Sequence, residues 1–404
     1  MLAGGGISKM LQAIANDGAV VTLALLTKAE IEFHRKHSTF ICPTCRHPVL
    51  IKAGQKTVPH FAHYPQSDCP SRGGGEGPYH KKGKLLLYLW LKKQFIDVAL
   101  EKYLPRIKQQ PDLYLKIGDK RIVIEYQCSR VDIRSILQRN QGYLSAGIIP
   151  IWILGANLFN RKGPYHLKVD SFLLQFVHQF NPSYPLTLFF FCPHSLQLVS
   201  FTDFFINKNN QAIGKFIFSK LTTIKFNQLF YQKHFSRNTL YRLWKAEKRN
   251  FRLKPRLSKF GKTRSWYQWL YLQNVQIDYL PSIIHLPISS QYLMKRPLWE
   301  WQSRLCLDIL YQKKIGSLFR LQTCMHRLKH DTNSANYFPL ISSQLHPVSE
   351  YLQILTQLRI IEAVAHDTYK ILTPISLHRS LDESLAKDSQ LMDQLIEHAV
   401  KGNI

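Results

Sequence analysis

The stretch RIVIEYQCSR, Arg121–Arg130, places a glutamate inside an apolar, β-branched run. The three residues before that glutamate predict a strand that enters a core. Burying an unpaired carboxylate costs several kcal/mol, so a buried Glu125 needs a charged partner, a metal or a chemical role. Gln127 follows on the same face of the strand, because side chains alternate between the two faces.

The turn before this strand decides which residue faces Glu125. In the IGDK turn, glycine stands first in a two-residue loop, as a type II′ hairpin turn prefers. Ile117 then pairs with Lys120, and Asp112 lies directly opposite Glu125 on the same face. Two carboxylates this close repel each other unless a cation or a shared proton relieves them. The hairpin therefore predicts a site for a hard divalent ion such as Mg²⁺ or Mn²⁺.

A stretch with helical periodicity, from about Tyr79 to Leu100, precedes the hairpin. If the helix begins slightly earlier, Glu76, His80 and Lys84 follow one another at four-residue spacing and share one face. A carboxylate, a proton carrier and a cation could approach the carboxylate pair from this face. An ordinary exposed helix face has the same spacing, so these three residues indicate a functional site only in combination with the carboxylate pair of the hairpin.

A second helix, about Ile133–Ala146, and an apolar strand, Ile148–Gly155, follow the hairpin. Helix, hairpin, helix and strand in about 80 residues describe a small α/β domain. We therefore expect three parts. They are an N-terminal hairpin and zinc-finger-like module in residues 1–71, the α/β domain in residues 72–170, and a basic, aromatic, mainly helical C-terminal region in residues 171–404.

A group of cysteines and histidines precedes the α/β domain. Cys42 and Cys45 stand two residues apart, His60 and His63 follow, and Cys69 lies six residues beyond. Zn²⁺ takes four such ligands, so five candidates compete for four positions. The two first cysteines are the firmest, and we favour His63 with Cys69 because the histidines of an extended segment point to opposite faces. Reduced cysteines and core histidines are the alternative interpretation.

The net charge of the 404-residue chain is +28, and it is concentrated in one segment. Phe201–Leu270 carries 16 Lys and Arg residues against two acidic ones, together with 16 aromatic residues. Basic side chains interleaved with aromatics suit single-stranded nucleic acid. The expected phosphate contacts are Arg242, Lys245, Lys248 and Arg249. The expected stacking residues are Tyr241, Trp244, Trp266 and Tyr267. A basic surface around an aromatic core, or contact with an anionic membrane surface, would give the same composition.

Other features narrow the class of protein. No apolar run reaches the roughly 18 residues that a membrane-spanning helix needs. The N-terminus lacks a basic segment followed by an apolar one, so we expect no secretion signal. Seven cysteines, an odd number, argue against a disulfide scaffold and for a reduced, cytoplasmic protein.

The segments QPDLYL (110–115) and IVIEYQCS (122–129) resemble the PD-(D/E)xK nuclease signature, in the variant with Gln where Lys is usual. EGPYHKKGKLLLYLWL (76–91) before them and QRNQGYLSAGIIPIWILG (138–155) after them resemble the competence protein CoiA family. The CPTC…HFAH…C order ahead of them is also that of the family. The resemblance covers about Met10 to Gly155.

The resemblance implies a cytoplasmic protein of naturally transformable bacteria that acts when incoming single-stranded DNA recombines with the chromosome. Its implied partners are single-stranded DNA, the recombinase and other competence proteins. Its implied fold is a PD-(D/E)xK core that binds Mg²⁺ through Asp112 and Glu125. The other implied site residues are Glu76 of the first helix, Gln127 at the Lys position, and His80, Arg139 and Tyr143 facing DNA.

Two departures leave the activity open. Gln110 stands where the family pattern has Arg, and Gln127 lacks the charge that Lys offers to a phosphate. Lys84 could supply that charge from the helix. One reading is a metal-dependent DNA nuclease. The other is a catalytically inactive factor that binds single-stranded DNA or loads a recombinase.

Overall fold

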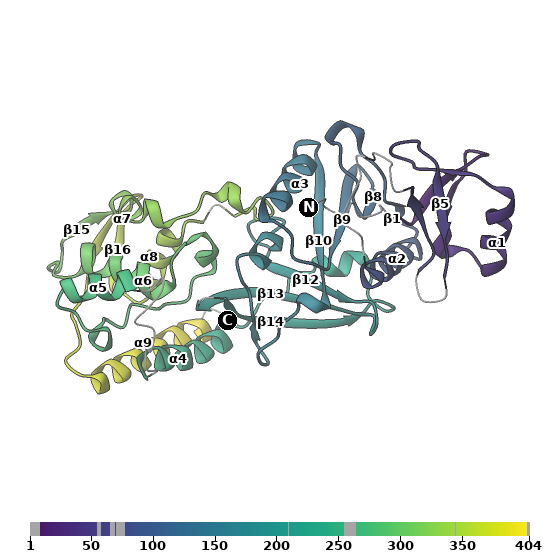
Figure 1. Cartoon of the computed structure of the whole chain (residues 1–404). Helices are drawn as coiled ribbons and strands as arrows, with labels where there is room; N and C mark the ends of the chain where they lie inside the picture. The colour runs from purple at the N-terminus through teal and green to yellow at the C-terminus, as the bar shows by residue number, and fades with distance from the viewer. Residues whose placement is uncertain are drawn as a thin grey trace. The chain divides into compact units, whose positions relative to one another are not determined.

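The protein is described by a computed structural model (Figure 1). The described residues are 9–54, 58–64, 69, 77–208, 210–253, 264–343 and 345–401. The chain divides into two compact units. The first comprises residues 1–160, 188–200 and 217–231, and the second comprises residues 161–187, 201–216 and 232–404. This division differs from the expected boundary near residue 170, because the chain passes back and forth between the two units.

The N-terminal part of the first unit contains two small sheets and one helix. Helix α1, Lys28–His37, begins with a capping box in which Thr27 and Glu30 satisfy each other's backbone N–H groups. The strands form the orders β1-β6-β5 and β3-β2-β4. They are β1 Lys9–Met10, β2 Gln12–Ala15, β3 Val20–Thr22, β4 Phe40–Ile41, β5 Val49–Lys52 and β6 His60–His63. Strands β2 and β3 pair as a hairpin, as predicted for this segment.

The α/β part of the first unit follows the predicted order. Its elements are α2 Pro78–Lys92, β7 Asp97–Leu100, β8 Leu113–Ile117, β9 Lys120–Gln127, α3 Ile133–Ser145 and β10 Ile148–Gly155. Strands β7, β8 and β9 are antiparallel, whereas β10 runs parallel to β9. The predicted first helix is too long, because the chain turns at Phe95 (φ +59°) and its last residues pair with β8 instead.

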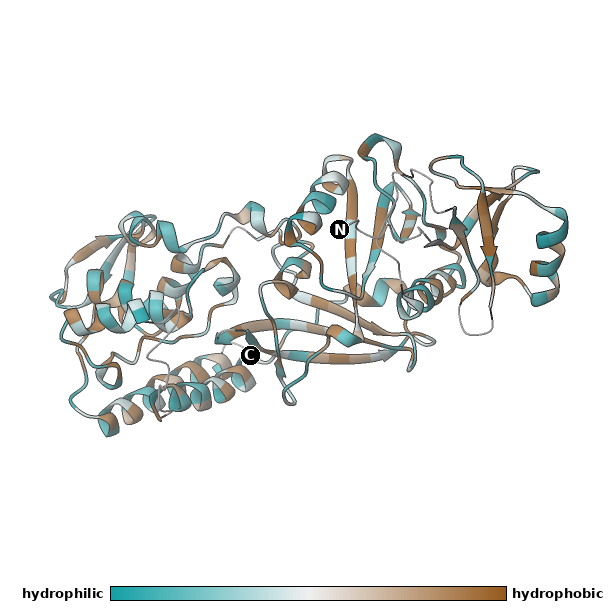
Figure 2. Ribbon diagram, in the orientation of Figure 1, coloured by the Kyte–Doolittle hydropathy of each residue, from teal (hydrophilic) through white to brown (hydrophobic). Residues whose placement is uncertain are grey.

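A further strand, β12 Thr187–Cys192, pairs in parallel with β10. It corrects the expectation of a mainly helical region from residue 171. The run TLFFFC has the β-branched and aromatic residues of a buried strand, and two long strands, β13 Gln197–Lys208 and β14 Gln211–Lys220, follow it. Most of β10 is coloured as hydrophobic in Figure 2, in keeping with a strand buried on both faces.

The second unit packs helices around a large hydrophobic core. Helices α4, Arg237–Leu253, and α9, Leu381–Lys401, lie side by side (Figure 1). The other elements are β11 His166–Leu167, α5 Arg264–Leu272, α6 Leu298–Leu305, β15 Leu318–Arg320, α7 Leu321–Arg327, α8 Pro347–Gln357, β16 Ile361–Ala365 and β17 Thr368–Ile371. The last strands form the sheet β15-β17-β16, so α8 is followed by a small hairpin. Among the described helices, none has the length and hydropathy needed to cross a bilayer.

Candidate functional site

The hairpin register is the one that the turn predicts. Ile117 pairs with Lys120 and Leu113 with Ile124, so Asp112, one residue before β8, lies at the position opposite Glu125. Gly118 has φ +55°, a conformation that favours glycine and closes the loop without strain. Glu125 is buried and the Asp112 side chain is 12% exposed, so the register brings two largely enclosed acidic groups to one place in the α/β part.

Asp112 is surrounded by donors from helix α2 and strand β9. Its Oδ1 lies 3.3 Å from Lys84 Nζ, and its Oδ2 lies 3.3 Å from His80 Nε2. The backbone N–H of Tyr126 donates to Oδ2 at 2.8 Å. Although burial alone would raise the pKa of Asp112, the charges of Lys84 and His80 hold that pKa well below its usual range. Asp112 is therefore an anion held by the first helix.

Glu125 has a different set of partners, Arg139 and Tyr143 of helix α3, and Tyr143 is fully buried rather than facing DNA as expected. Arg139 donates from Nε at 3.1 Å and also from Nη2, and the Tyr143 hydroxyl donates to the same carboxylate oxygen, Oε1. Burial raises the pKa of Glu125 above its ordinary value against the opposing charge of Arg139, and the charge of Asp112 adds to the rise. The two carboxylates thus have environments that push their pKa values apart.

Sequence reasoning missed a third buried carboxylate, Glu101, which follows strand β7. Its Oε1 lies 2.6 Å from Lys84 Nζ, and its Oε2 accepts the backbone N–H of Leu11 at 2.8 Å. Glu101 is 8% exposed and Lys84 is 1% exposed. The available signal was the same as for Glu125, an acidic residue directly after the apolar residues of a strand.

Helix α2 reaches the strands closely because of Gly83. A Cβ atom at this position would lie 2.0 Å from Cε1 of Tyr126, well inside contact distance. The glycine lets the helix backbone lie against the Tyr126 ring, and His80 stacks on the same ring at 5.5 Å between centroids. This close packing carries Lys84 and His80 to Asp112.

Of the remaining predicted residues of this site, the two glutamines bind backbone carbonyl groups, and the glutamate is not described. Gln127 donates to the backbone carbonyl of Ser129 at 2.6 Å. Gln110 donates to the carbonyl of Glu101 at 2.7 Å, while its own carbonyl accepts from Arg139 at 3.1 Å. Glu76 lies outside the described residues, so its predicted place at the start of the helix stays a prediction.

The cysteine and histidine cluster forms in the N-terminal part. One candidate ligand atom from each of Cys42, Cys45, His63 and Cys69 lies within 4.8 Å of the others. Cys42 Sγ and Cys69 Sγ are 3.9 Å apart, and Cys45 Sγ and His63 Nε2 are 3.3 Å apart. Ligand atoms of a tetrahedral zinc ion stand about 3.5–3.8 Å apart, so the set fits such an ion. His60 is outside this set, and its Nδ1 lies 2.9 Å from the carbonyl oxygen of Val58.

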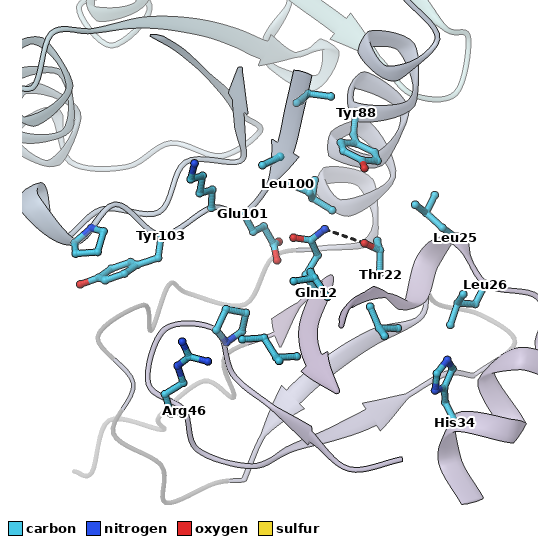
Figure 3. Close-up of a pocket in the computed structure, with 18 residues that line it drawn as sticks. Gln12, Thr22, Leu25, Leu26, His34, Arg46, Tyr88, Leu100, Glu101 and Tyr103 are labelled. Carbon is cyan, nitrogen blue, oxygen red and sulfur yellow. Dashed lines mark hydrogen bonds between the residues drawn. The ribbon is translucent and has the colours of Figure 1, made fainter. Parts of the chain in front are cut away.

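A cavity of about 850 Å³ lies within the first unit, between the N-terminal sheets and the α/β part. Its wall includes Gln12 and Thr22 of the N-terminal sheets and Leu100 and Glu101 from the end of β7 (Figure 3). Gln12 donates to the Thr22 hydroxyl at 2.8 Å. The Glu101 side chain lies beside Gln12 in this view, at the boundary of the two parts.

The basic C-terminal stretch corrects part of the prediction. Trp244 and Trp266 are buried, at 0% and 1% exposure, so they cannot stack on bases. Lys248 is also buried, and its ammonium group donates to the carbonyls of Ser282 and Ile284 and lies 3.4 Å from Asp388. The expected phosphate contact by Lys248 is therefore wrong. Its ammonium group instead links helix α4 to the buried segment around residues 282–284 and to helix α9.

The other predicted contacts of this stretch lie nearer the surface. Arg242 and Arg249 are exposed on α4. Lys245 is partly exposed and donates to both carboxylate oxygens of Asp393. Tyr241 is buried, whereas Tyr267 is partly exposed. Two arginines of the four predicted phosphate contacts thus keep exposed charges.

Comparison with known proteins supports the class that this site suggests. Residues 76–234 match the family model described as "Competence protein CoiA, nuclease-like domain". Residues 23–72 and 240–385 match the models for the N-terminal and C-terminal domains of the same protein. The chain is 26% identical over 367 residues to the competence protein CoiA of Bacillus subtilis (strain 168), covering 87% of this chain and 95% of that protein. No solved structure matches the chain.

The buried carboxylates and the matched domain place the protein among those with a nuclease-like domain. Three consecutive domain matches and the similarity to the Bacillus protein go further: the chain belongs to the competence protein CoiA family.

Proposed function

We propose that this protein is a metal-dependent phosphodiesterase that processes incoming single-stranded DNA in the cytoplasm during natural transformation. The observation that carries the proposal is the facing pair of Asp112 and the buried Glu125 among a helix, three antiparallel strands, a helix and a parallel strand. This order of elements agrees with a PD-(D/E)xK core, the fold that the sequence motifs suggest. The family match to a nuclease-like domain supports the same class.

The donor set suits a hard divalent cation such as Mg²⁺ or Mn²⁺. Both groups are carboxylates, the ligands that these ions prefer. Among the described residues, the hydrogen bonds to Glu125 fall on Oε1, so Oε2 keeps its lone pairs for a cation. A bound cation would neutralise negative charge that develops on the phosphodiester during cleavage.

The protein side chains would position the substrate and balance its charge. Lys84 stands within 3.3 Å of Asp112 and takes the part that Lys usually plays at the position of Gln127. His80, on the same helix face, can carry a proton to or from a group bound at Asp112. Arg139 and Tyr143 hold Glu125 in place and leave its orientation fixed while DNA binds.

One observation favours a second candidate function. Gln127 carries no charge, and its amide donates to Ser129 rather than to either carboxylate, so strand β9 supplies no cation to the site. Without that charge the domain would bind single-stranded DNA, or load a recombinase, without cutting it. The exposed Arg242 and Arg249 would serve DNA binding in both cases.

The cysteine and histidine cluster would hold one Zn²⁺ that stabilises the N-terminal part. The purified protein should contain about one zinc per chain, measured by elemental analysis. Replacing Cys42 and Cys45 by Ser should remove the metal, whereas replacing the buried Cys306 of the second unit by Ser should not. Zinc content that survives the double replacement would rule out this ligand set.

A cleavage assay decides between the two functions. The full-length protein is mixed with labelled single- and double-stranded DNA in Mg²⁺, Mn²⁺ or EDTA. The nuclease predicts cleavage that requires the divalent ion and is lost in Asp112→Ala but kept in Asp97→Asn, an exposed acidic residue at the start of β7. Tight DNA binding without cleavage under any of these conditions would reject the nuclease and support the non-catalytic function.

A further inference from the structure

Glu101 joins more parts of the first unit than its place after β7 suggests. Its side chain accepts from two donors, Lys84 Nζ through Oε1 at 2.6 Å and the Leu11 N–H through Oε2 at 2.8 Å. Lys84 belongs to helix α2, and Leu11 to the N-terminal part beside strand β2. Its φ of +50° is uncommon for a residue with a side chain, so the surrounding contacts hold an unfavourable backbone conformation.

The backbone of Glu101 also faces the carboxylate site. Its N–H donates to the carbonyl of Asp112 at 2.9 Å, and its carbonyl accepts from Gln110 Nε2 at 2.7 Å. The carbonyl of Gln110 in turn accepts from Arg139, the partner of Glu125. The segment that leads into Asp112 is therefore held by Glu101, and one chain of hydrogen bonds runs from there to Glu125.

We propose that Glu101 is a positioning residue that neutralises Lys84 and so sets the affinity of the Asp112–Glu125 pair for a divalent cation. The inference rests on the proposed cation site. Lys84 Nζ lies closer to Glu101 (2.6 Å) than to Asp112 (3.3 Å), so Glu101 balances a larger share of its charge than Asp112 does. Asp112 then keeps negative charge for a cation, while Lys84 stays near enough to face a bound phosphate.

A carboxylate is the group that this position requires. Two donors, an ammonium group and a backbone N–H, each need one acceptor oxygen. Glutamine has one oxygen and one NH₂ group, so one of the two donors would face another donor. The Leu11 N–H also binds this carboxylate, so the N-terminal part helps to hold the charged group that balances Lys84.

The test measures the affinity of the full-length protein for Mn²⁺ by calorimetry. Glu101→Gln should weaken binding by about tenfold, because an unbalanced Lys84 shifts its charge to Asp112 and repels the cation. Glu101→Asp keeps the charge on a shorter side chain and should lie between wild type and Glu101→Gln. Asp97→Asn, on the same strand but exposed, should bind as wild type does.

A double-mutant cycle separates positioning from a general loss of structure. In a Lys84→Met background, Glu101→Gln should change Mn²⁺ affinity by less than about twofold, because the charge through which it acts is gone. An equal tenfold loss in both backgrounds would overturn the assignment, as would wild-type affinity in Glu101→Gln. If Glu101→Gln does not fold, Glu101→Asp is compared in the two backgrounds instead.

The outcomes also distinguish this inference from the proposed function. If the wild-type protein binds Mn²⁺ and the Glu101→Gln variant binds it equally well, only the proposed role of Glu101 is refuted. If the wild-type protein binds no Mn²⁺, or if the Asp112→Ala variant binds it as well as wild type does, both the cation site and the role of Glu101 are refuted.

Discussion

At the scale of single residues, several buried charges in the described part of the chain lie beside groups of opposite sign. Glu125 is 5% exposed and depends on Arg139 for a countercharge. Removing one member of a buried ion pair costs more than the pair contributes, because the other charge is left without compensation. The stability of the α/β part should therefore depend on groups that also shape the candidate site.

Arg139→Gln tests this dependence. It should lower the free energy of unfolding by about 2 kcal/mol, less than for a fully buried pair because the arginine itself is partly exposed. Arg134→Gln, exposed on the same helix, should stay within about 0.5 kcal/mol of wild type. Urea denaturation of both variants gives the comparison. Equal stability of the two variants would mean that Glu125 finds another partner.

A second residue-scale prediction concerns His285 in the second unit. Its ring is buried among Trp244, Phe251 and Trp299, and its Nε2 lies 3.1 Å from the Asn207 carbonyl oxygen. Burial lowers the pKa of His285 to about 4 from an ordinary value of 6.5. The unfolded chain therefore takes up a proton on this group at higher pH than the folded one does.

The sign of the effect follows directly. The stabilising contribution is fully present above pH 6.5 and is lost as the pH falls from there toward about 4. Between pH 7 and pH 5 this one group should lower the free energy of unfolding by about 2 kcal/mol. His285→Gln should show a correspondingly smaller loss over the same interval, and an unchanged pH dependence in the variant would contradict the prediction.

At the scale of elements, helix α2 depends on one glycine for its distance from the sheet. Alanine normally stabilises a helix relative to glycine by about 1 kcal/mol. At Gly83 the new methyl group would meet the Tyr126 ring at 2.0 Å, so the helix or the ring must move. Overpacking of this kind costs about 1–3 kcal/mol, which reverses the usual sign.

Gly83→Ala should therefore destabilise the protein, since the helix or the Tyr126 ring must move to make room for the methyl group. Gly54→Ala is the matched control, because no atom lies within 4 Å of the added group and the backbone there is unstrained. Thermal unfolding of the two variants measures the difference in stability. Stabilisation by Gly83→Ala would show that the helix has room that the described packing does not allow.

At the scale of the whole molecule, the large positive charge calls for a polyanionic partner. Phosphate contacts release counterions, so binding to single-stranded DNA weakens as salt rises, with a slope of about −0.7 for each contact. The burial of Lys248 and the pairing of Lys245 with Asp393 leave Arg242 and Arg249 as the exposed charges of this cluster.

Replacing Arg242 and Arg249 together by Gln should reduce the salt slope by about 1.4 and weaken binding to all sequences alike. The double replacement of Lys314 and Lys329, exposed elsewhere in the second unit, keeps the net charge equal and serves as control. Salt titrations with a fluorescent oligonucleotide measure both slopes. Equal slopes for the two variants would place the DNA path away from α4.

The local pattern of the chain determined the α/β part and most of its site. Turn chemistry at Gly118 set the hairpin register, and that register placed Asp112 opposite Glu125 because side chains in paired strands face one another in a fixed order. Ligand spacing likewise offered five candidates, and the four that were favoured among them form the cysteine and histidine cluster. These features depend on residues close together in the chain, where spacing alone constrains geometry.

Only the tertiary structure decided the features that depend on distant contacts. It buried Lys248 and two tryptophans that composition alone assigns to a DNA surface, because these side chains pack against and donate to groups 34 or more residues further along the chain. It also brought the Leu11 amide to Glu101, 90 residues away along the chain. A sequence pattern reports residue type and spacing, whereas burial and long-range pairing depend on which surfaces meet when the chain folds.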